Sequence, residues 1–153
     1  MQKIVNENKT IIFKGPYSLA FKEGEFDVLG ITPDKDERIT IPENKFLPVY
    51  AIKQGKLEVQ DDYPNNTTEV NGKVIPVSWE KLVEKVLKSE INSILIIGAG
   101  SAGKTTLTTY LANKLSAAGR SVSLIDSDLG QSDIGPVGSI GLSILEKKVY
   151  DMS

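Results

Sequence analysis

The stretch from Ile96 to Tyr110, IIGAGSAGKTTLTTY, places three glycines, a lysine and a run of threonines between an apolar run and a helical pattern. Within it, Gly98 to Thr105 fits the spacing G-x-x-x-x-G-K-[ST] in full. The continuous apolar run Ser93 to Gly98 is typical of a strand buried in a parallel sheet, and the residues after the motif recur at helical spacing. The motif in this strand–helix context predicts an α/β domain of the P-loop NTPase class.

Each residue type in this motif has a chemical reason. Glycine and alanine let the backbone wrap so that its amides point at phosphate oxygens, and the helix N-terminus adds its positive end. Lys104 brings a positive charge to the β and γ phosphates, and Thr105 offers a hydroxyl oxygen to Mg²⁺. The motif therefore predicts a site for a nucleoside triphosphate with magnesium. The residues expected to line it are Gly98, Ala99, Gly100, Ser101, Ala102, Gly103, Lys104, Thr105 and Thr106.

A second stretch, LIDSDLGQSDIGP from Leu124 to Pro136, carries two carboxylates at the end of another apolar run. Asp126 and Asp128 are two residues apart, so on an extended chain they point the same way, off the strand end where ligands sit in open parallel sheets. One can support magnesium, usually through water, and the other can accept a proton from an attacking hydroxyl. The chain has no histidine, which makes a carboxylate the natural base. For Asp133, a role in the site and a plain loop position are equally open.

The two halves of the chain follow different patterns. Residues 1–77 read as short half-apolar strands of a small all-β sandwich or barrel, with turns expected at Glu23-Gly24 and Gln54-Gly55 and a hairpin at Asn71-Gly72. This half shows no chemistry, and a structural role is favoured over a ligand- or partner-contacting one. Residues 78–153 run α-β-α-β, with Ser78 as a helix cap, which is the first part of a doubly wound parallel sheet.

Composition excludes several classes of function. The 153 residues are 40% hydrophobic and 25% charged, with a formal net charge of −2, so the chain is no generic polyanion binder. Without histidine or cysteine it has no Ser-His-Asp triad, no disulfide and no thiolate or imidazole metal site. No apolar run is long enough for a membrane span, and the N-terminus has no signal-peptide pattern, so a cytoplasmic location is expected.

Several stretches together resemble the polynucleotide 5′-hydroxyl-kinase family, which includes archaeal RNA kinases, a pre-mRNA cleavage factor subunit and nucleolar rRNA-processing kinases. They are FKGPYSLAF (13–21), VIPVSWEKLVEKV (74–86), GSAGKTTLTTYLANKL (100–115) and IDSDLGQSDIGP (125–136). The resemblance implies an N-terminal β domain beside a P-loop kinase domain. It also implies transfer of the γ-phosphate of ATP or GTP to the 5′-hydroxyl end of RNA or DNA.

The resemblance also implies roles for single residues. Lys104 would bind phosphate, Thr105 would bind Mg²⁺, and Asp128 would be the base toward the 5′-hydroxyl. Asp126 would support the water shell of the metal, and Gln131 would help to place the acceptor end.

One feature of the family has no counterpart in the sequence. Family members continue with a clasp over the phosphates and a lid with arginines, whereas this chain has only Arg38 and Arg120, neither near the motif. We therefore expect the chain to be an N-terminal portion that is inactive alone and that associates with itself or with a partner chain. Two alternatives stay open: a nucleotide-binding scaffold subunit of an RNA-processing complex, and an NTPase switch or small-molecule kinase.

Overall fold

The computed structural model describes residues 1–60, 66–130, 132, 134–146 and 148–150. The chain divides into two compact units, Met1–Pro76 and Val77–Ser153, each taken by itself below. This division lies one residue before the boundary expected from the change in sequence pattern.

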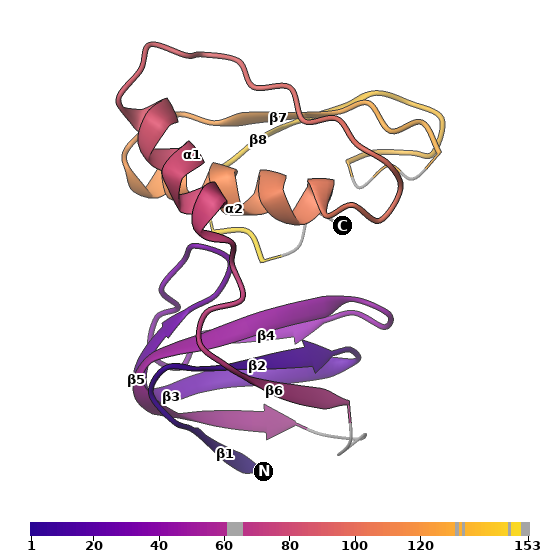
Figure 1. Cartoon of the computed structure of the whole chain (residues 1–153). Helices are drawn as coiled ribbons and strands as arrows, with labels where there is room; N and C mark the ends of the chain where they lie inside the picture. The colour runs from indigo at the N-terminus through magenta and orange to yellow at the C-terminus, as the bar shows by residue number, and fades with distance from the viewer. Residues whose placement is uncertain (61–65, 131, 133, 147, 151–153) are drawn as a thin grey trace. The chain divides into compact units, whose positions relative to one another are not determined.

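The first unit is an antiparallel sheet (Figure 1). Its hydrogen-bonded order is β4-β3-β5-β2-β6, and β1 also pairs with β5. One edge of β5 pairs with β3, while residues 46–50 pair with β2 and residues 55–58 with β1. The strands are β1 (Gln2–Val5), β2 (Lys9–Lys14), β3 (Tyr17–Asp27), β4 (Arg38–Ile41), β5 (Phe46–Gln60) and β6 (Thr67–Asn71).

Alternation along the strands builds the core of this unit. In β5 every second residue from Leu47 to Ala51, and again from Gly55 to Val59, is buried, because successive side chains of a strand face opposite sides. Two aromatic pairs fill the interior edge to face, Phe13 with Tyr17 at 5.4 Å and Phe21 with Phe26 at 5.3 Å between ring centroids.

Two expected turns lie inside strands instead. Glu23-Gly24 and Gln54-Gly55 belong to β3 and β5, which pair there with shifts of register. A Cβ on Gly24 would lie 2.4 Å from the Cα of Gly55, and one on Gly55 would lie 2.5 Å from the Phe26 ring. The two glycines mark a close approach of backbones at an irregularity in the sheet, which has the same local composition as a turn.

The hairpin expected at Asn71-Gly72 is wrong. β6 ends at Asn71, and Gly72 takes a positive φ of 79°, but the following residues form no strand. Gly72 is held by tertiary bonds: its amide donates to the Asn8 carbonyl at 2.7 Å, and its carbonyl accepts the buried Thr10 hydroxyl at 2.6 Å. Lys73 then pairs with the buried Asp27 at 3.0 Å. These contacts fix the exit from the sheet without a returning strand.

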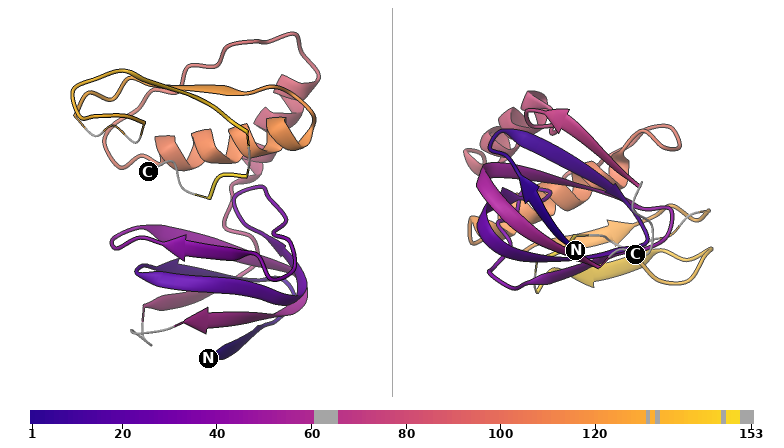
Figure 2. Two further views of the ribbon diagram at one scale, coloured as in Figure 1. Left: turned by 180° about the vertical axis from the view of Figure 1, so that it is seen from behind. Right: turned by 90° about the horizontal axis from the view of Figure 1, so that it is seen from below.

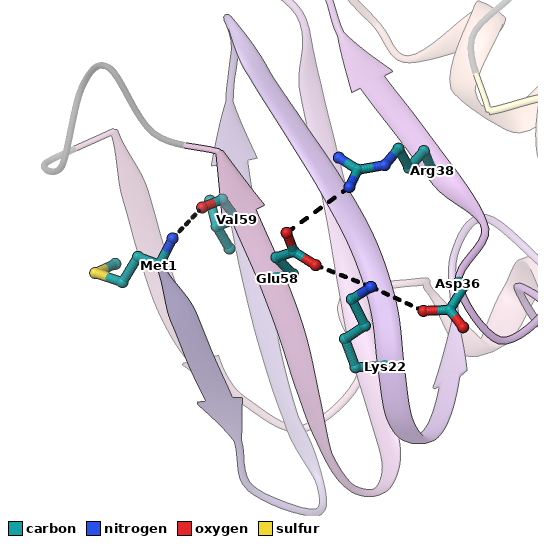
Figure 3. A network of polar contacts seen from close by, with 6 residues as sticks. All are labelled: Met1, Lys22, Asp36, Arg38, Glu58 and Val59. Atoms are coloured by element: carbon teal, nitrogen blue, oxygen red, sulfur yellow. Dashed lines mark hydrogen bonds and ion pairs between the residues drawn. The ribbon is translucent and has the colours of Figure 1, made fainter.

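A polar network crosses the outer face of the first unit (Figure 3). The Lys22 ammonium lies 2.8 Å from Asp36 and 2.9 Å from Glu58, and Arg38 lies 3.7 Å from Glu58. The hydrogen bond and charge of Lys22 lower the pKa of both carboxyls, and the bonds to the two carboxylates raise the pKa of Lys22. The network links β3, β4 and β5 through charge pairs across neighbouring strands.

The second unit contains α1 (Val77–Leu87), α2 (Lys104–Ala117), β7 (Ser123–Asp126) and β8 (Gly141–Ile144). Helix α1 begins at Val77, one residue before the expected cap, and buries Val83 and Val86. Trp79 packs against the buried Tyr110 of α2, with ring centroids 5.8 Å apart. Arg120 donates to the carbonyls of Leu87, Ser89 and Ile91, so it joins the end of α1 to the end of α2.

The strand expected at Ser93–Gly98 is not formed. These residues have no strand assignment, and Leu95 and Ile97 are each 81% exposed. β7 begins at Ser123 rather than Ser121 and pairs antiparallel with β8, so the described residues contain no parallel pair. An apolar run becomes a buried parallel strand only when a strand lies on its edge, and no described strand does so here.

Among the described residues, no helix has the length and apolar character needed to cross a bilayer.

Candidate nucleotide site

The glycine motif forms an irregular loop that ends at the first residue of α2. Residues 99–103 are turns and bends, and Ser101 and Gly103 have positive φ values of 58° and 83°. Gly103 is the N-cap residue, and a glycine relieves the strain of the left-handed conformation there. Lys104 folds back over the loop, and its ammonium donates to the Ala99 carbonyl at 3.1 Å.

The start of α2 suits an anion. Gly103 offers no side chain, and no side-chain hydrogen bond caps the first helical amides. The first turn contains no acidic residue, and it carries the positive charge of Lys104. Uncapped amides, the helix dipole and an ammonium group together fit a phosphate. The chain therefore provides the donors that a triphosphate needs at this loop.

The two predicted carboxylates lie at the end of β7, which Figures 1 and 2 show at the same end of the second unit as the P-loop. The Asp126 carboxylate accepts the Asp128 amide at 3.0 Å, the Ser132 hydroxyl at 3.3 Å and the Ile134 amide at 3.3 Å. Asp128 is exposed and accepts the Gly130 amide at 3.2 Å. Asp126 is thus tied into its loop, and Asp128 is the more accessible carboxylate.

The oxygen donors here suit magnesium. The Thr105 hydroxyl and the carboxylates of Asp126 and Asp128 are hard ligands, which Mg²⁺ prefers. In the part of the chain that is described, no three acidic side chains gather as a metal site. A magnesium ion would therefore depend on phosphate oxygens and water for most of its coordination, as is usual for nucleotide-bound magnesium.

The structure leaves some predicted residues undescribed: Gln131 and Asp133 lie outside the described residues. Both arginines have partners within their own units, Arg38 with Glu58 in the first unit and Arg120 with the carbonyls after α1 in the second. At the glycine loop the cation that the structure shows is the ammonium of Lys104.

Sequence reasoning missed two polar residues in this unit. Ser132 donates toward Asp126, and the buried Asn113 of α2 exchanges two bonds with the backbone of Val149, at 2.7 and 3.2 Å. The sequence contained one indication of the contact between Asn113 and Val149. Asn113 is a polar residue among apolar ones that are buried, namely Tyr110, Leu111, Ala112 and Leu115, and a buried polar side chain needs a hydrogen-bond partner.

Comparison with known proteins gives a match over the second unit. Residues 98–153 match the family model described as the mRNA cleavage and polyadenylation factor CLP1 P-loop. A polyribonucleotide 5′-hydroxyl-kinase of Pyrococcus horikoshii is 50% identical over 54 residues, covering 35% of this chain and 15% of the relative. A second, of Thermococcus kodakarensis, is 35% identical over 80 residues, covering 52% and 23%. The polynucleotide 5′-hydroxyl-kinase GRC3 of Cryptococcus neoformans is 32% identical over 77 residues, covering 47% and 10%.

Solved structures extend the similarity in fold. The wild-type Clp1p–Pcf11p complex contains a chain that matches 94% of this one with a TM-score of 0.73 at 18% identity, and 36% of that chain is covered. These neighbours have the P-loop kinase fold, in agreement with the predicted fold class of a β domain followed by an incomplete α/β domain. The chain spans less than a quarter of the length of the curated relatives above. The glycine motif and the D-x-D-x-G-Q element both lie in the part of the chain that matches the CLP1 P-loop family model and that is similar to polynucleotide 5′-hydroxyl-kinases.

Proposed function

We propose that the chain binds ATP or GTP with magnesium at residues 98–106 and serves the transfer of the γ-phosphate to the 5′-hydroxyl of a polynucleotide. The observation that supports this most is the uncapped start of α2, with Lys104 over the loop, at the same end of the unit as Asp126 and Asp128. A donor site and a candidate base for the acceptor thus meet in one region of the unit.

The residues have different roles in the proposed reaction. The loop amides and Lys104 hold the phosphates and keep the reacting group in place, since phosphoryl transfer depends mainly on positioning and charge stabilisation. Asp128, exposed beside this region, takes the proton of the attacking 5′-hydroxyl. Thr105 and Asp126 would hold magnesium, directly or through water, and the ion would supply positive charge for the β and γ phosphates. Gln131 would help to place the acceptor end.

RNA is the favoured acceptor. The archaeal relatives carry the name polyribonucleotide 5′-hydroxyl-kinase, and they reach 50% identity over the matched residues. The net charge of −2 means that overall charge does not supply the attraction for a polyanion, so recognition of the 5′ end has to be local.

The test is transfer of labelled γ-phosphate to a 5′-hydroxyl oligoribonucleotide, with a 5′-phosphorylated oligonucleotide and a matched DNA as controls. It is run on the 153-residue chain and on any longer polypeptide that the same gene encodes. Transfer that Lys104→Ala abolishes supports the proposal. Nucleotide binding without transfer in both polypeptides contradicts it.

A scaffold role is the second candidate, and the arginines favour it. Because Arg38 and Arg120 have partners within their own units, the chain can hold a triphosphate yet lack the guanidinium that stabilises the transferring group. One solved structural neighbour is Clp1p in a complex with Pcf11p. Tight nucleotide binding, no transfer and recovery of a bound protein partner would together favour this role.

A further inference from the structure

The carboxylate of Asp126 gathers the loop that follows β7. Its Oδ1 accepts the amide of Asp128 at 3.0 Å, and its Oδ2 lies 3.3 Å from both the Ser132 hydroxyl and the Ile134 amide nitrogen. These donors come from two, six and eight residues further along the chain. One half-buried side chain thus bonds to Asp128, Ser132 and Ile134, which all follow the end of β7.

Ser132 is the one side chain in this set of donors. Its hydroxyl lies 3.3 Å from Asp126 Oδ2 and 3.0 Å from the Ile134 carbonyl, and it has a single proton to donate. The Ile134 carbonyl is the nearer acceptor and the Asp126 carboxylate is the charged one, so the hydroxyl is shared between the two oxygens. The Ser132 hydroxyl and the Ile134 amide then fix the direction of the same oxygen.

Asp128 depends on this arrangement. Its backbone amide is bonded to Asp126, and its own Oδ1 accepts the Gly130 amide at 3.2 Å. The starting point and the direction of the Asp128 carboxylate therefore follow from the backbone that Asp126 holds. Loss of the Ser132 contact would leave Asp126 held by the two backbone amides, and its Oδ2 would lose a side-chain donor, which loosens the common orientation of the two carboxylates.

We propose that Ser132 is a positioning residue, which acts through Asp126 to orient the two carboxylates toward a bound magnesium–triphosphate. This rests on the proposed function, since it takes the P-loop as the triphosphate site. Ser132 itself need not touch nucleotide, metal or acceptor. Groups that hold a metal-supporting carboxylate in place are worth about 10- to 100-fold in metal affinity or activity when they are removed.

The first measurement needs no bound nucleotide. Amide hydrogen exchange at Asp128 and Ile134 is followed by NMR in the wild type, Ser132→Ala and Ser132→Thr. We expect faster exchange at both amides in Ser132→Ala and restoration in Ser132→Thr, which keeps the hydroxyl. Ser139→Ala is the matched control, because the Ser139 hydroxyl lies in the same loop but donates to the Pro136 carbonyl at 2.6 Å. Unchanged amides in α2 show that the unit remains folded.

The second measurement is the affinity for ATP with and without Mg²⁺. Ser132→Ala is expected to reduce the gain in affinity that magnesium brings by about tenfold. The magnesium-free affinity, which the P-loop supplies, stays unchanged, and so does the gain in Ser132→Thr and in Ser139→Ala. A loss of folded protein would lower both affinities together, which separates positioning from a general structural effect.

The two measurements distinguish failure of the positioning role from failure of the proposed nucleotide site. If Ser132→Ala leaves exchange at Asp128 and Ile134 as it is in Ser139→Ala, or leaves the magnesium gain intact, the positioning role is wrong. If the wild type shows no magnesium-dependent binding of ATP, the proposed nucleotide site fails, and the exchange rates still decide whether Ser132 holds the loop.

Discussion

Lys104 and Asp128 have different partners in the proposed reaction, and substitutions should separate them. Lys104 lies over the loop that suits the phosphates, with its ammonium on the Ala99 carbonyl. Asp128 is exposed just after the end of β7, and its carboxylate accepts the Gly130 amide within its own loop. The first residue therefore affects the phosphate donor and the second affects the acceptor.

Replacing Lys104 with alanine should weaken ATP binding by about 10-fold or more, since a charge-assisted bond contributes roughly 1.5–3 kcal/mol. The measurement is the dissociation constant of a fluorescent ATP analogue with Mg²⁺. Lys81→Ala, an exposed lysine of α1 in the same unit, is the control and should bind normally. Equal affinities for the two variants would remove Lys104 from the site.

Replacing Asp128 with asparagine should spare nucleotide affinity and lower transfer to a 5′-hydroxyl oligonucleotide by about 100-fold or more, because a positioned general base contributes 10²–10⁴-fold. The comparison of affinity with transfer rate is made in the polypeptide that transfers phosphate. Transfer at the wild-type rate would show that another group is the base.

The candidate site residues could be predicted from the sequence because the spacing of each motif indicates its chemistry. Lys104 and Thr105 follow from the glycine motif, and Asp126 and Asp128 follow from their position after an apolar run. Ser132 could not be found in this way, since its contact with Asp126 exists only where the loop returns to the end of β7. Nothing in the spacing of a serine in a polar loop indicates which carboxylate it meets.

At the scale of elements, strands could be predicted where apolar and polar residues alternate clearly. The prediction was wrong where strand formation depends on a neighbouring strand. β2 and β4 lie in the part predicted to form short half-apolar strands, and the apolar residues of each strand mark its buried face. Gly24 and Gly55 were predicted to lie in turns, but in the structure they allow two strands to approach closely. Ser93–Gly98 has the composition of a buried strand, yet a strand also needs a neighbour, which composition does not supply.

The charge network on the first unit should make its stability depend on pH. The pKa values of Asp36 and Glu58 are lowered by Lys22, so their contribution is present above the ordinary carboxyl range and is lost as the pH falls through their folded-state values. The pKa of Lys22 is raised, so its contribution persists until the pH rises above the ordinary lysine range.

We therefore expect Lys22→Met to lower the melting temperature of this unit at pH 7, and the gap from the wild type to shrink at pH 3. Thermal unfolding followed by circular dichroism at both pH values measures this. Lys14→Met is the control, because the Lys14 ammonium lies over the Phe46 ring at 5.8 Å rather than in this network. A gap that is the same at pH 3 and pH 7 would show that the network contributes nothing.

At the scale of the whole chain, the second unit exposes apolar side chains that a folded domain normally covers. Ile125 and Leu142 are directly paired across β7 and β8, and Ile144 lies two residues on, so the three share one face of the ribbon. They are 71%, 66% and 61% exposed. A contiguous apolar face of this kind tends to associate, because burial of apolar area is favourable.

The purified chain should therefore self-associate, and the double variant Ile125→Thr/Leu142→Thr should reduce the association. Light scattering across a concentration series measures the mass. Ile4→Thr, at an exposed isoleucine of β1 in the first unit, is the control and should associate as the wild type does. A wild-type chain that remains monomeric over the concentration series would show that this apolar face does not cause self-association.

The most direct test of the account is an NMR titration of the chain with ATP and Mg²⁺, in which the amide shifts report where the nucleotide binds. We expect the largest amide shift changes at residues 98–106 and at Asp126 and Asp128. These changes should be absent in Lys104→Ala. Shifts confined to other parts of the chain, or the same shifts in Lys104→Ala, would contradict the account.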